Sequence, residues 1–105
     1  MRNDKAIFIT GAAAGIGRAT ALTFARKGYT VGAYDIDEAG LGTLAEEIGR
    51  LGATVHTGHL DVTDTDAMST RVSEFATQAG NRLDVMVNNA GILKAGRFED
   101  IDVRA

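Results

Sequence analysis

The sequence contains no cysteine, and this absence excludes a disulfide framework, a thiolate metal site and a cysteine nucleophile. A basic surface is lacking as well, because 11 Lys and Arg residues stand against 14 Asp and Glu residues and are scattered along the chain. With a net charge of -3, no nucleic-acid partner is expected. After MRNDK only the short apolar run Ala6–Ile9 follows, which is too brief for a signal peptide or a membrane span. A cytoplasmic location is therefore expected.

What is present fits one small globular domain. The chain has 105 residues, of which 45% are hydrophobic and 24% are charged. Short apolar runs alternate with segments of helical periodicity, and this alternation predicts a β-α-β-α-β-α-β order with a parallel sheet and right-handed crossovers. The expected strands are Ala6–Thr10, Thr30–Tyr34, Thr54–His59 and Leu83–Val87, and the expected helices are Gly15–Lys27, one from Leu41 to about Leu51, and one from about Thr63 to Gly80.

Two details of this plan concern the third strand and the helix after it. Thr54–His59 is polar and contains a glycine, which is typical of a strand at the edge of a sheet. Thr63, followed three residues later by Asp66, resembles a capping box. We therefore expect this strand at the edge and Thr63 as the N-cap.

The stretch ITGAAAGIG lies directly between the first strand and the first helix, and its glycines are Gly11, Gly15 and Gly17. Backbone without side chains can approach a pyrophosphate closely, and the N-terminus of a helix favours an anion. The alternative is a tight turn whose small residues serve only helix packing. Arg18, which follows the last glycine, is interpreted as a solvated surface residue.

Asp35 follows the second strand, where dinucleotide-binding sheets place an acid that accepts hydrogen bonds from the adenosine ribose. A carboxylate there repels a 2′-phosphate, so NAD is favoured over NADP as cofactor. The alternative is that Asp35 only begins a turn with Asp37.

Further small or polar residues follow the third and fourth strands at the same rim, namely Asp61, Val62, Asn88, Asn89, Ala90 and Gly91. Ligands of open α/β sheets bind at this rim. Alternatively, Asp61 only marks the entry to the next helix, and the asparagines lie in a loop where their side chains hydrogen-bond to the neighbouring backbone. His56 and His59 point to opposite faces of a strand, so no metal site is expected.

Together, ITGAAAGIG, Asp35, Asp61-Val62 and VMVNNAG resemble the N-terminal half of a short-chain dehydrogenase/reductase, over essentially the whole chain. The resemblance implies a Rossmann-type doubly wound parallel sheet with strand order 3-2-1-4. It implies that the glycine turn contacts the pyrophosphate, that Asp35 holds the ribose, that Asp61 and Val62 contact the adenine, and that the asparagine segment lines the adenosine side. The implied cofactor-binding residues are Gly11, Gly15, Ile16, Gly17, Asp35, Asp61, Val62, Asn88, Ala90 and Gly91.

The same resemblance implies an NAD-dependent oxidoreductase that interconverts small alcohols and carbonyls. Members of the family use a Tyr-x-x-x-Lys pair with an upstream Ser, and neither Tyr29 nor Tyr34 begins such a pair. We therefore expect residues 1–105 to be the NAD(P)-binding domain, truncated before the catalytic half, with no catalytic residue and no activity of its own. The alternatives are a non-catalytic nucleotide-binding module and a nonfunctional truncated product.

The expected absence of the catalytic half also predicts incomplete packing of the sheet. Part of the sheet would be poorly covered and the fourth strand would be an unpaired edge, so we expect self-association, as a homo-oligomer, or partial order. The strand residues concerned are Ile7, Phe8, Ile9, Val85, Met86 and Val87. In the tail, Asp102 is placed as the N-cap of a beginning helix.

Overall fold

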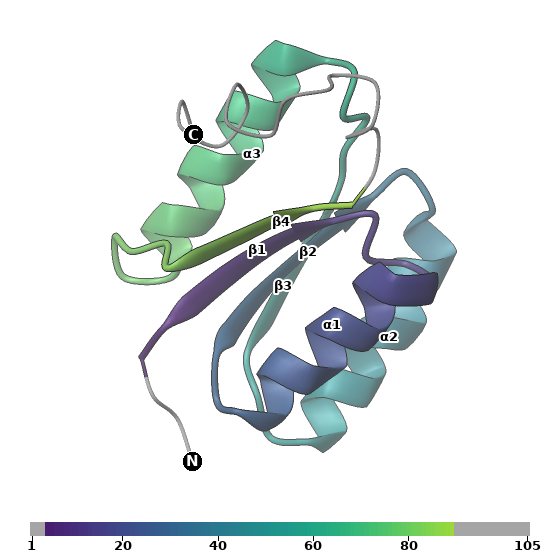
Figure 1. Ribbon diagram of the computed structural model, residues 1–105, viewed down its shortest axis with the longest axis vertical. Coiled ribbons are helices and arrows are strands. Elements are labelled where there is room, and N and C mark those ends of the chain that lie inside the picture. Colours follow the sequence, from purple (N-terminus) through teal and green to yellow (C-terminus); the bar gives the residue numbers. More distant parts are fainter. Residues whose placement is uncertain (1–3, 90–105) are drawn as a thin grey trace.

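A computed structural model describes residues 4–89 of the chain, which form a parallel sheet with helices on both faces (Figure 1). The predicted alternation of strands and helices is confirmed, and the fold is a doubly wound α/β sheet. The elements in chain order are β1 (Ala6–Thr10), α1 (Gly15–Arg26), β2 (Thr30–Asp35), α2 (Glu38–Arg50), β3 (Val55–His59), α3 (Thr65–Gln78) and β4 (Val85–Asn88).

The strand order is β3-β2-β1-β4, with every neighbouring pair parallel. The predicted order and the position of the polar strand β3 at an edge are both confirmed. Figure 1 shows α1 and α2 side by side on one face of the sheet and α3 on the other. This arrangement follows from right-handed crossovers, because the chain reverses direction across the sheet after β3 and returns to pair β4 with β1.

Two apolar clusters hold the layers together, one on each face. On the first, Ile7 and Ile9 of β1 pack with Leu44 and Ile48 of α2, all fully buried. On the second, Phe8 stacks on Tyr34 with ring centroids 4.7 Å apart, and Phe75 of α3 covers them. Each cluster buries an alternate set of β1 side chains, so β1 is a fully covered central strand.

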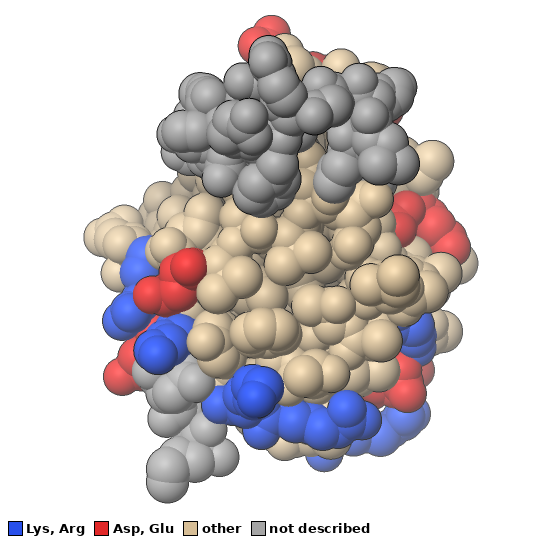
Figure 2. Space-filling model, in the orientation of Figure 1, with Lys and Arg blue, Asp and Glu red and all other residues tan. Residues whose placement is uncertain are grey.

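The expected poor cover of the sheet is therefore wrong for Ile7, Phe8 and Ile9, which are fully buried because α1, α2 and α3 suffice to cover β1. Val85, Met86 and Val87 of β4 are half-buried. In Figure 2 the centre of the visible face, in the region of β4 and α1, carries neither acidic nor basic side chains, whereas Lys and Arg lie along its lower border. Self-association stays a prediction, which light scattering and calorimetry would test.

Gly32 in the middle of β2 has a packing reason. A Cβ built on this glycine would lie 2.7 Å from the ring of Phe75, which is closer than two non-bonded carbon atoms approach each other. The missing side chain lets α3 seat its largest apolar residue directly on the sheet. The packing of α3 on the sheet thus depends on a glycine in β2, three elements earlier in the chain.

The ends of two helices differ from the sequence-based expectation. The N-cap of α3 is Asp64, whose side chain accepts a 3.0 Å hydrogen bond from Ala67 N, so the prediction of a Thr63–Asp66 capping box is wrong. The hydroxyl of Thr63 instead donates a hydrogen bond to the carboxylate of Asp61. Helix α2 starts earlier than its apolar periodicity indicates, because Asp37 caps it by accepting a hydrogen bond from Gly40 N.

Candidate functional site

The carboxyl ends of all four strands meet at one edge of the sheet. β1 ends at Thr10, β2 at Asp35, β3 at His59 and β4 at Asn88, and the parallel pairing brings these ends to one rim. The predicted site residues from Gly11 to Asn88 follow or end these strands. Ala90, Gly91 and Asp102 lie outside the described residues.

The glycine turn after β1 requires glycine at more than one position. Gly11 and Gly15 have φ angles of 65° and 59°, in the left-handed region that side chains disfavour. Gly17 is required for a different reason: a Cβ on it would lie 2.1 Å from the carbonyl oxygen of Gly11. The first turn of α1 is thereby packed directly against the backbone that leaves β1.

The N-terminus of α1 differs from those of α2 and α3. Its N-cap residue, Ala14, offers no side-chain hydrogen bond, and no acidic residue stands in the first turn. By contrast, Asp37 and Asp64 cap α2 and α3. Because the first N–H groups of a helix have no intrahelical partners, α1 presents donors and positive dipole to the rim. Ile16, in this first turn, is 78% exposed.

Asp35 connects the end of β2 to the glycine turn. Its Oδ2 accepts a 3.0 Å hydrogen bond from Ala13 N, and its Oδ1 accepts a 3.1 Å bond from Asp37 N. The second bond is the local turn that the alternative interpretation of Asp35 expected. The first is a long-range contact that this alternative does not include, and it places the carboxylate beside the turn. Ile36, next along the chain, is 63% exposed.

A buried hydrogen bond joins β1 to β4 at the same rim. The hydroxyl of Thr10, fully buried, donates to Oδ1 of Asn88 over 2.7 Å. The side-chain amide of Asn89 donates to the carbonyl oxygen of Thr10 over 3.2 Å. The asparagine pair therefore fixes the strand that leads into the glycine turn.

Asp61 and Val62 follow β3 on the other side of β2. Oδ1 of the exposed Asp61 accepts hydrogen bonds from Thr63 N, at 2.9 Å, and Thr63 Oγ1, at 2.6 Å. These bonds hold the pKa of Asp61 below its ordinary range, because they favour the ionised carboxyl. Val62 is partly buried against the cluster around Phe75. The rim thus carries two carboxylates, that of Asp35 at the end of β2 and that of Asp61 just after β3.

Arg18 is not the solvated residue that its position suggested. Its Nη1 donates to the carbonyl oxygens of Ala13, at 3.5 Å, and Gly40, at 3.3 Å, and to Thr43 Oγ1, at 3.3 Å. Its Nη2 forms an ion pair with Glu47 of α2. The signal that sequence reasoning missed is the i, i+3, i+7 stripe of Gly40, Thr43 and Glu47, which faces α1.

The family is decided by comparison with known proteins. A family model described as short chain dehydrogenase matches residues 5–105. The chain belongs to this family. The predicted resemblance is therefore confirmed, and so is the assignment to a family of oxidoreductases.

Two individual relatives, one named an oxidoreductase and one a reductase, agree with this assignment. A probable oxidoreductase of Mycobacterium tuberculosis, EphD, is 43% identical over 97 residues, covering 92% of this chain and 16% of that protein. The 3-oxoacyl-[acyl-carrier-protein] reductase FabG of Thermotoga maritima is 47% identical over 90 residues, covering 86% of this chain and 36% of the relative.

A solved structure extends the likeness to three dimensions. Carveol dehydrogenase from Mycobacterium avium, crystallised in complex with NAD, superposes with a TM-score of 0.78 at 33% identity, over 83% of this chain and 35% of that chain. This chain thus spans little more than a third of that structure, and from 16% to 36% of the two relatives.

Neither tyrosine of this short-chain dehydrogenase chain lies free at the rim. Tyr34 is buried against Phe8, and burial raises its pKa to about 12. Tyr29 packs edge-on against Phe24, with ring centroids 4.8 Å apart. The Tyr34 ring thus packs between β1 and α3, and the Tyr29 ring packs against α1.

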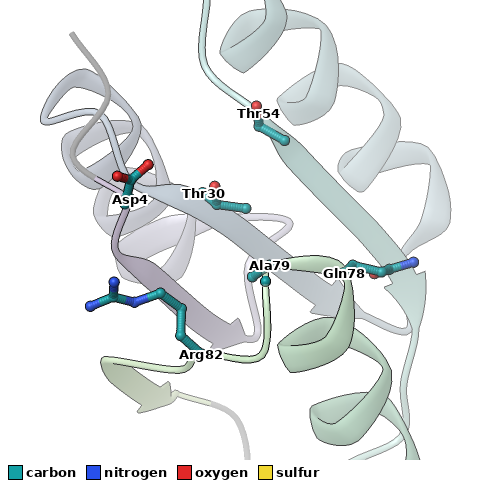
Figure 3. A pocket seen from close by; sticks show the side chains of 7 residues that line it. Asp4, Thr30, Thr54, Gln78, Ala79 and Arg82 are labelled. Carbon is teal, nitrogen blue, oxygen red and sulfur yellow. The ribbon is translucent and has the colours of Figure 1, made fainter.

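A shallow pocket of about 410 Å³ lies at the opposite edge of the sheet (Figure 3). It is formed where strands begin rather than where they end, with Thr30 at the start of β2, Thr54 just before β3 and Arg82 before β4. It is therefore separate from the candidate site. Within residues 4–89 no group of His, Asp and Glu side chains could hold a metal ion, and no helix is long and apolar enough to cross a membrane.

Proposed function

We propose that residues 1–105 form the NAD-binding domain of a short-chain oxidoreductase that interconverts small alcohols and carbonyls. The observation that carries the proposal is the contact of Asp35 with Ala13, which sets a carboxylate against a glycine turn at the open N-terminus of α1. Family membership supports it, since the chain belongs to the short-chain dehydrogenases.

The glycine turn provides the seat for the cofactor's pyrophosphate. Gly11, Gly15 and Gly17 leave the backbone without Cβ atoms, and Ala14 leaves the N–H groups of the first helical turn without a competing side chain. An anion placed there meets backbone donors and the positive end of the helix dipole. Ile16, exposed beside these donors, is proposed to contact the cofactor through its backbone and apolar side chain.

Asp35 is proposed to bind the adenosine ribose and to select NAD over NADP. Each oxygen of an ionised carboxylate has two acceptor sites, and in Asp35 one site on each is taken by Ala13 N or Asp37 N. The remaining sites can accept hydrogen bonds from ribose hydroxyls. A 2′-phosphate in the same place would bring its negative charge against the carboxylate.

Asp61, Val62 and the asparagine segment are proposed to frame the adenosine. Asp61 is exposed and kept ionised by Thr63, so its second oxygen is able to accept a hydrogen bond from the adenine amino group. Asn88 fixes the strand beneath the cofactor through Thr10. Ala90 and Gly91 complete the proposed set. When bound, nicotinamide supplies the hydride-accepting and hydride-donating chemistry.

Fluorescence titration tests this proposal directly. NADH and NADPH are each added to the full chain, and the protein-bound enhancement of nicotinamide emission is followed. We expect NADH to bind more tightly than NADPH. Equal binding of the two would contradict the role of Asp35, and binding of neither would contradict the proposed function.

A further inference from the structure

We infer that Glu47 determines cofactor choice through Arg18: by pairing with the guanidinium on α2, it withholds a positive charge from the 2′-phosphate position beside Asp35. The inference rests on the proposed function, since it concerns the ribose end of the proposed NAD site. Glu47 would touch no cofactor, so it is a positioning residue. Its role would be to keep the acid at Asp35 effective against NADP.

The first observation is how close Arg18 lies to the ribose end. Arg18 Nη1 donates to Ala13 O, and the N–H of the same residue, Ala13, donates to the carboxylate of Asp35. The guanidinium of Arg18 and the carboxylate proposed to hold the ribose therefore contact the same residue, Ala13, one at its carbonyl oxygen and the other at its N–H. Salt screens two charges that contact the same residue only partly, because the Debye length at physiological salt is about 8 Å.

The second observation is what holds the guanidinium. Three acceptors of α2 face it, namely Gly40 O, Thr43 Oγ1 and a carboxylate oxygen of Glu47. Only the last carries a charge. The Arg18 side chain is 26% exposed and that of Glu47 is 43% exposed, so the pair is partly shielded from solvent and its charges largely cancel beyond the contact.

Removing the charge of Glu47 leaves the positive charge of Arg18 uncompensated near Asp35. The guanidinium would keep its carbonyl and hydroxyl partners on the loop and on α2, but its charge would no longer be compensated. A 2′-phosphate near Asp35 would then meet a cation and an anion instead of an anion alone. Since NADH lacks the phosphate, its affinity would change little. The ratio of the two affinities is therefore the quantity that reports the role of Glu47.

The chain offers a matched control on the same helix. Glu46 precedes Glu47 and carries the same charge, but it forms its ion pair with Arg50, at 3.9 Å, and not with Arg18. Glu46→Gln therefore removes one negative charge from α2, as Glu47→Gln does, but leaves the Arg18–Glu47 ion pair in place. Glu47→Asp keeps the charge on a shorter side chain, and Arg18→Met combined with Glu47→Gln removes both charges.

The experiment is a titration of the full chain and these variants with NADH and NADPH, with circular dichroism melts of each variant. We expect Glu47→Gln to raise NADPH affinity about two- to fivefold, the range of one exposed ion pair, and to leave NADH affinity nearly unchanged. We expect no rise in NADPH affinity in the double variant or in Glu46→Gln, and only a small rise in Glu47→Asp. The rise in Glu47→Gln should become smaller in about 0.5 M NaCl, because salt screens the interaction between the guanidinium and the phosphate.

The possible failures are distinguishable. If the unmodified chain binds NADH but Glu47→Gln leaves the NADPH to NADH ratio unchanged, the inference is overturned and the proposed function stands. An equal gain in Glu46→Gln, or a gain that survives loss of Arg18, overturns it as well, since the effect would then be one of net charge. Failure of the unmodified chain to bind either cofactor overturns the proposed function and the inference with it.

Discussion

The carboxylate of Asp35 accepts a 3.0 Å hydrogen bond from the backbone N–H of Ala13, 22 residues earlier in the chain. The contact joins the end of β2 to the turn that follows β1, so the acid and the glycine turn form one unit at the rim. The predictions below follow from this unit and from the hydrogen bonds that support it.

Replacing Asp35 should narrow the preference for NADH. In Asp35→Ala the carboxylate that repels a 2′-phosphate is gone, and Ala13 N loses its side-chain acceptor. We expect NADH affinity to fall and NADPH affinity to stay the same or rise. Parallel fluorescence titrations of the two cofactors measure the ratio. A ratio equal to that of the unmodified chain would show that Asp35 does not select the cofactor.

Replacing Gly17 should damage both the fold and the cofactor site. A Cβ at this position would lie 2.1 Å from Gly11 O, and backbone has to move to accommodate it. We expect Gly17→Ala to lower the free energy of unfolding by about 1–3 kcal/mol, as overpacking does, and to abolish NADH binding. Urea denaturation followed by circular dichroism measures the first effect.

Gly49→Ala is the matched control for Gly17→Ala. Gly49 lies inside α2, and a Cβ there would meet nothing within 4 Å. Since alanine favours a helix over glycine, this change should raise the free energy of unfolding by up to about 1 kcal/mol and leave binding intact. Equal behaviour of the two variants would argue against the close approach at Gly17.

The buried bond between Thr10 and Asn88 should contribute measurably to stability. Thr10→Val keeps the shape of the side chain but leaves Oδ1 of Asn88 without its 2.7 Å donor. A buried acceptor that loses its partner costs about 1–3 kcal/mol. We expect a loss of that size in urea denaturation, and a smaller loss of about 0.5–1.5 kcal/mol in Thr10→Ser, which keeps the hydroxyl but deletes a buried methyl group. Equal losses would point to packing rather than to the hydrogen bond.

The pH dependence of Asp61 follows from its lowered pKa. Because its pKa in the folded state lies below the unfolded value, the stabilisation from Thr63 is present above the ordinary Asp range and is lost as pH falls through the folded-state pKa. Carboxyl-carbon NMR should therefore show Asp61 titrating below pH about 3.9, the ordinary value. In Thr63→Val the midpoint should return toward that value; an unchanged midpoint would remove Thr63 as the cause.

Much of this fold is readable from the sequence because the strands are marked locally. Ala6–Thr10 is a continuous apolar run that ends at a glycine turn, and its predicted bounds equal the observed ones. The predicted order of strands came from the family resemblance, and the structure has that order. Local patterns are therefore sufficient for the bounds of β1, whereas the strand order depends on the family resemblance.

The rest depends on contacts between residues distant in sequence. A Thr followed three residues later by an acid is a common capping signature, so the sequence predicts the cap of α3 at Thr63. In the structure Asp64 is the cap, and the Thr63 hydroxyl donates a hydrogen bond to Asp61. The sequence predicts a solvated Arg18, because its partners on α2 lie 22 to 29 residues away in the chain. Local periodicity indicates which residues of α2 share a face, but not which residue of α1 they meet.

The central claim is that a nucleotide binds at the carboxyl edge, against the glycine turn and Asp35. The most direct measurement is a ¹H–¹⁵N NMR titration of the full chain with NAD⁺. We predict that the amide signals of Gly15, Ile16, Gly17 and Asp35 shift most, and that those of Thr30 and Thr54, at the pocket of the opposite edge, stay in place. Shifts confined to the opposite edge, or no shifts at all, would contradict the account.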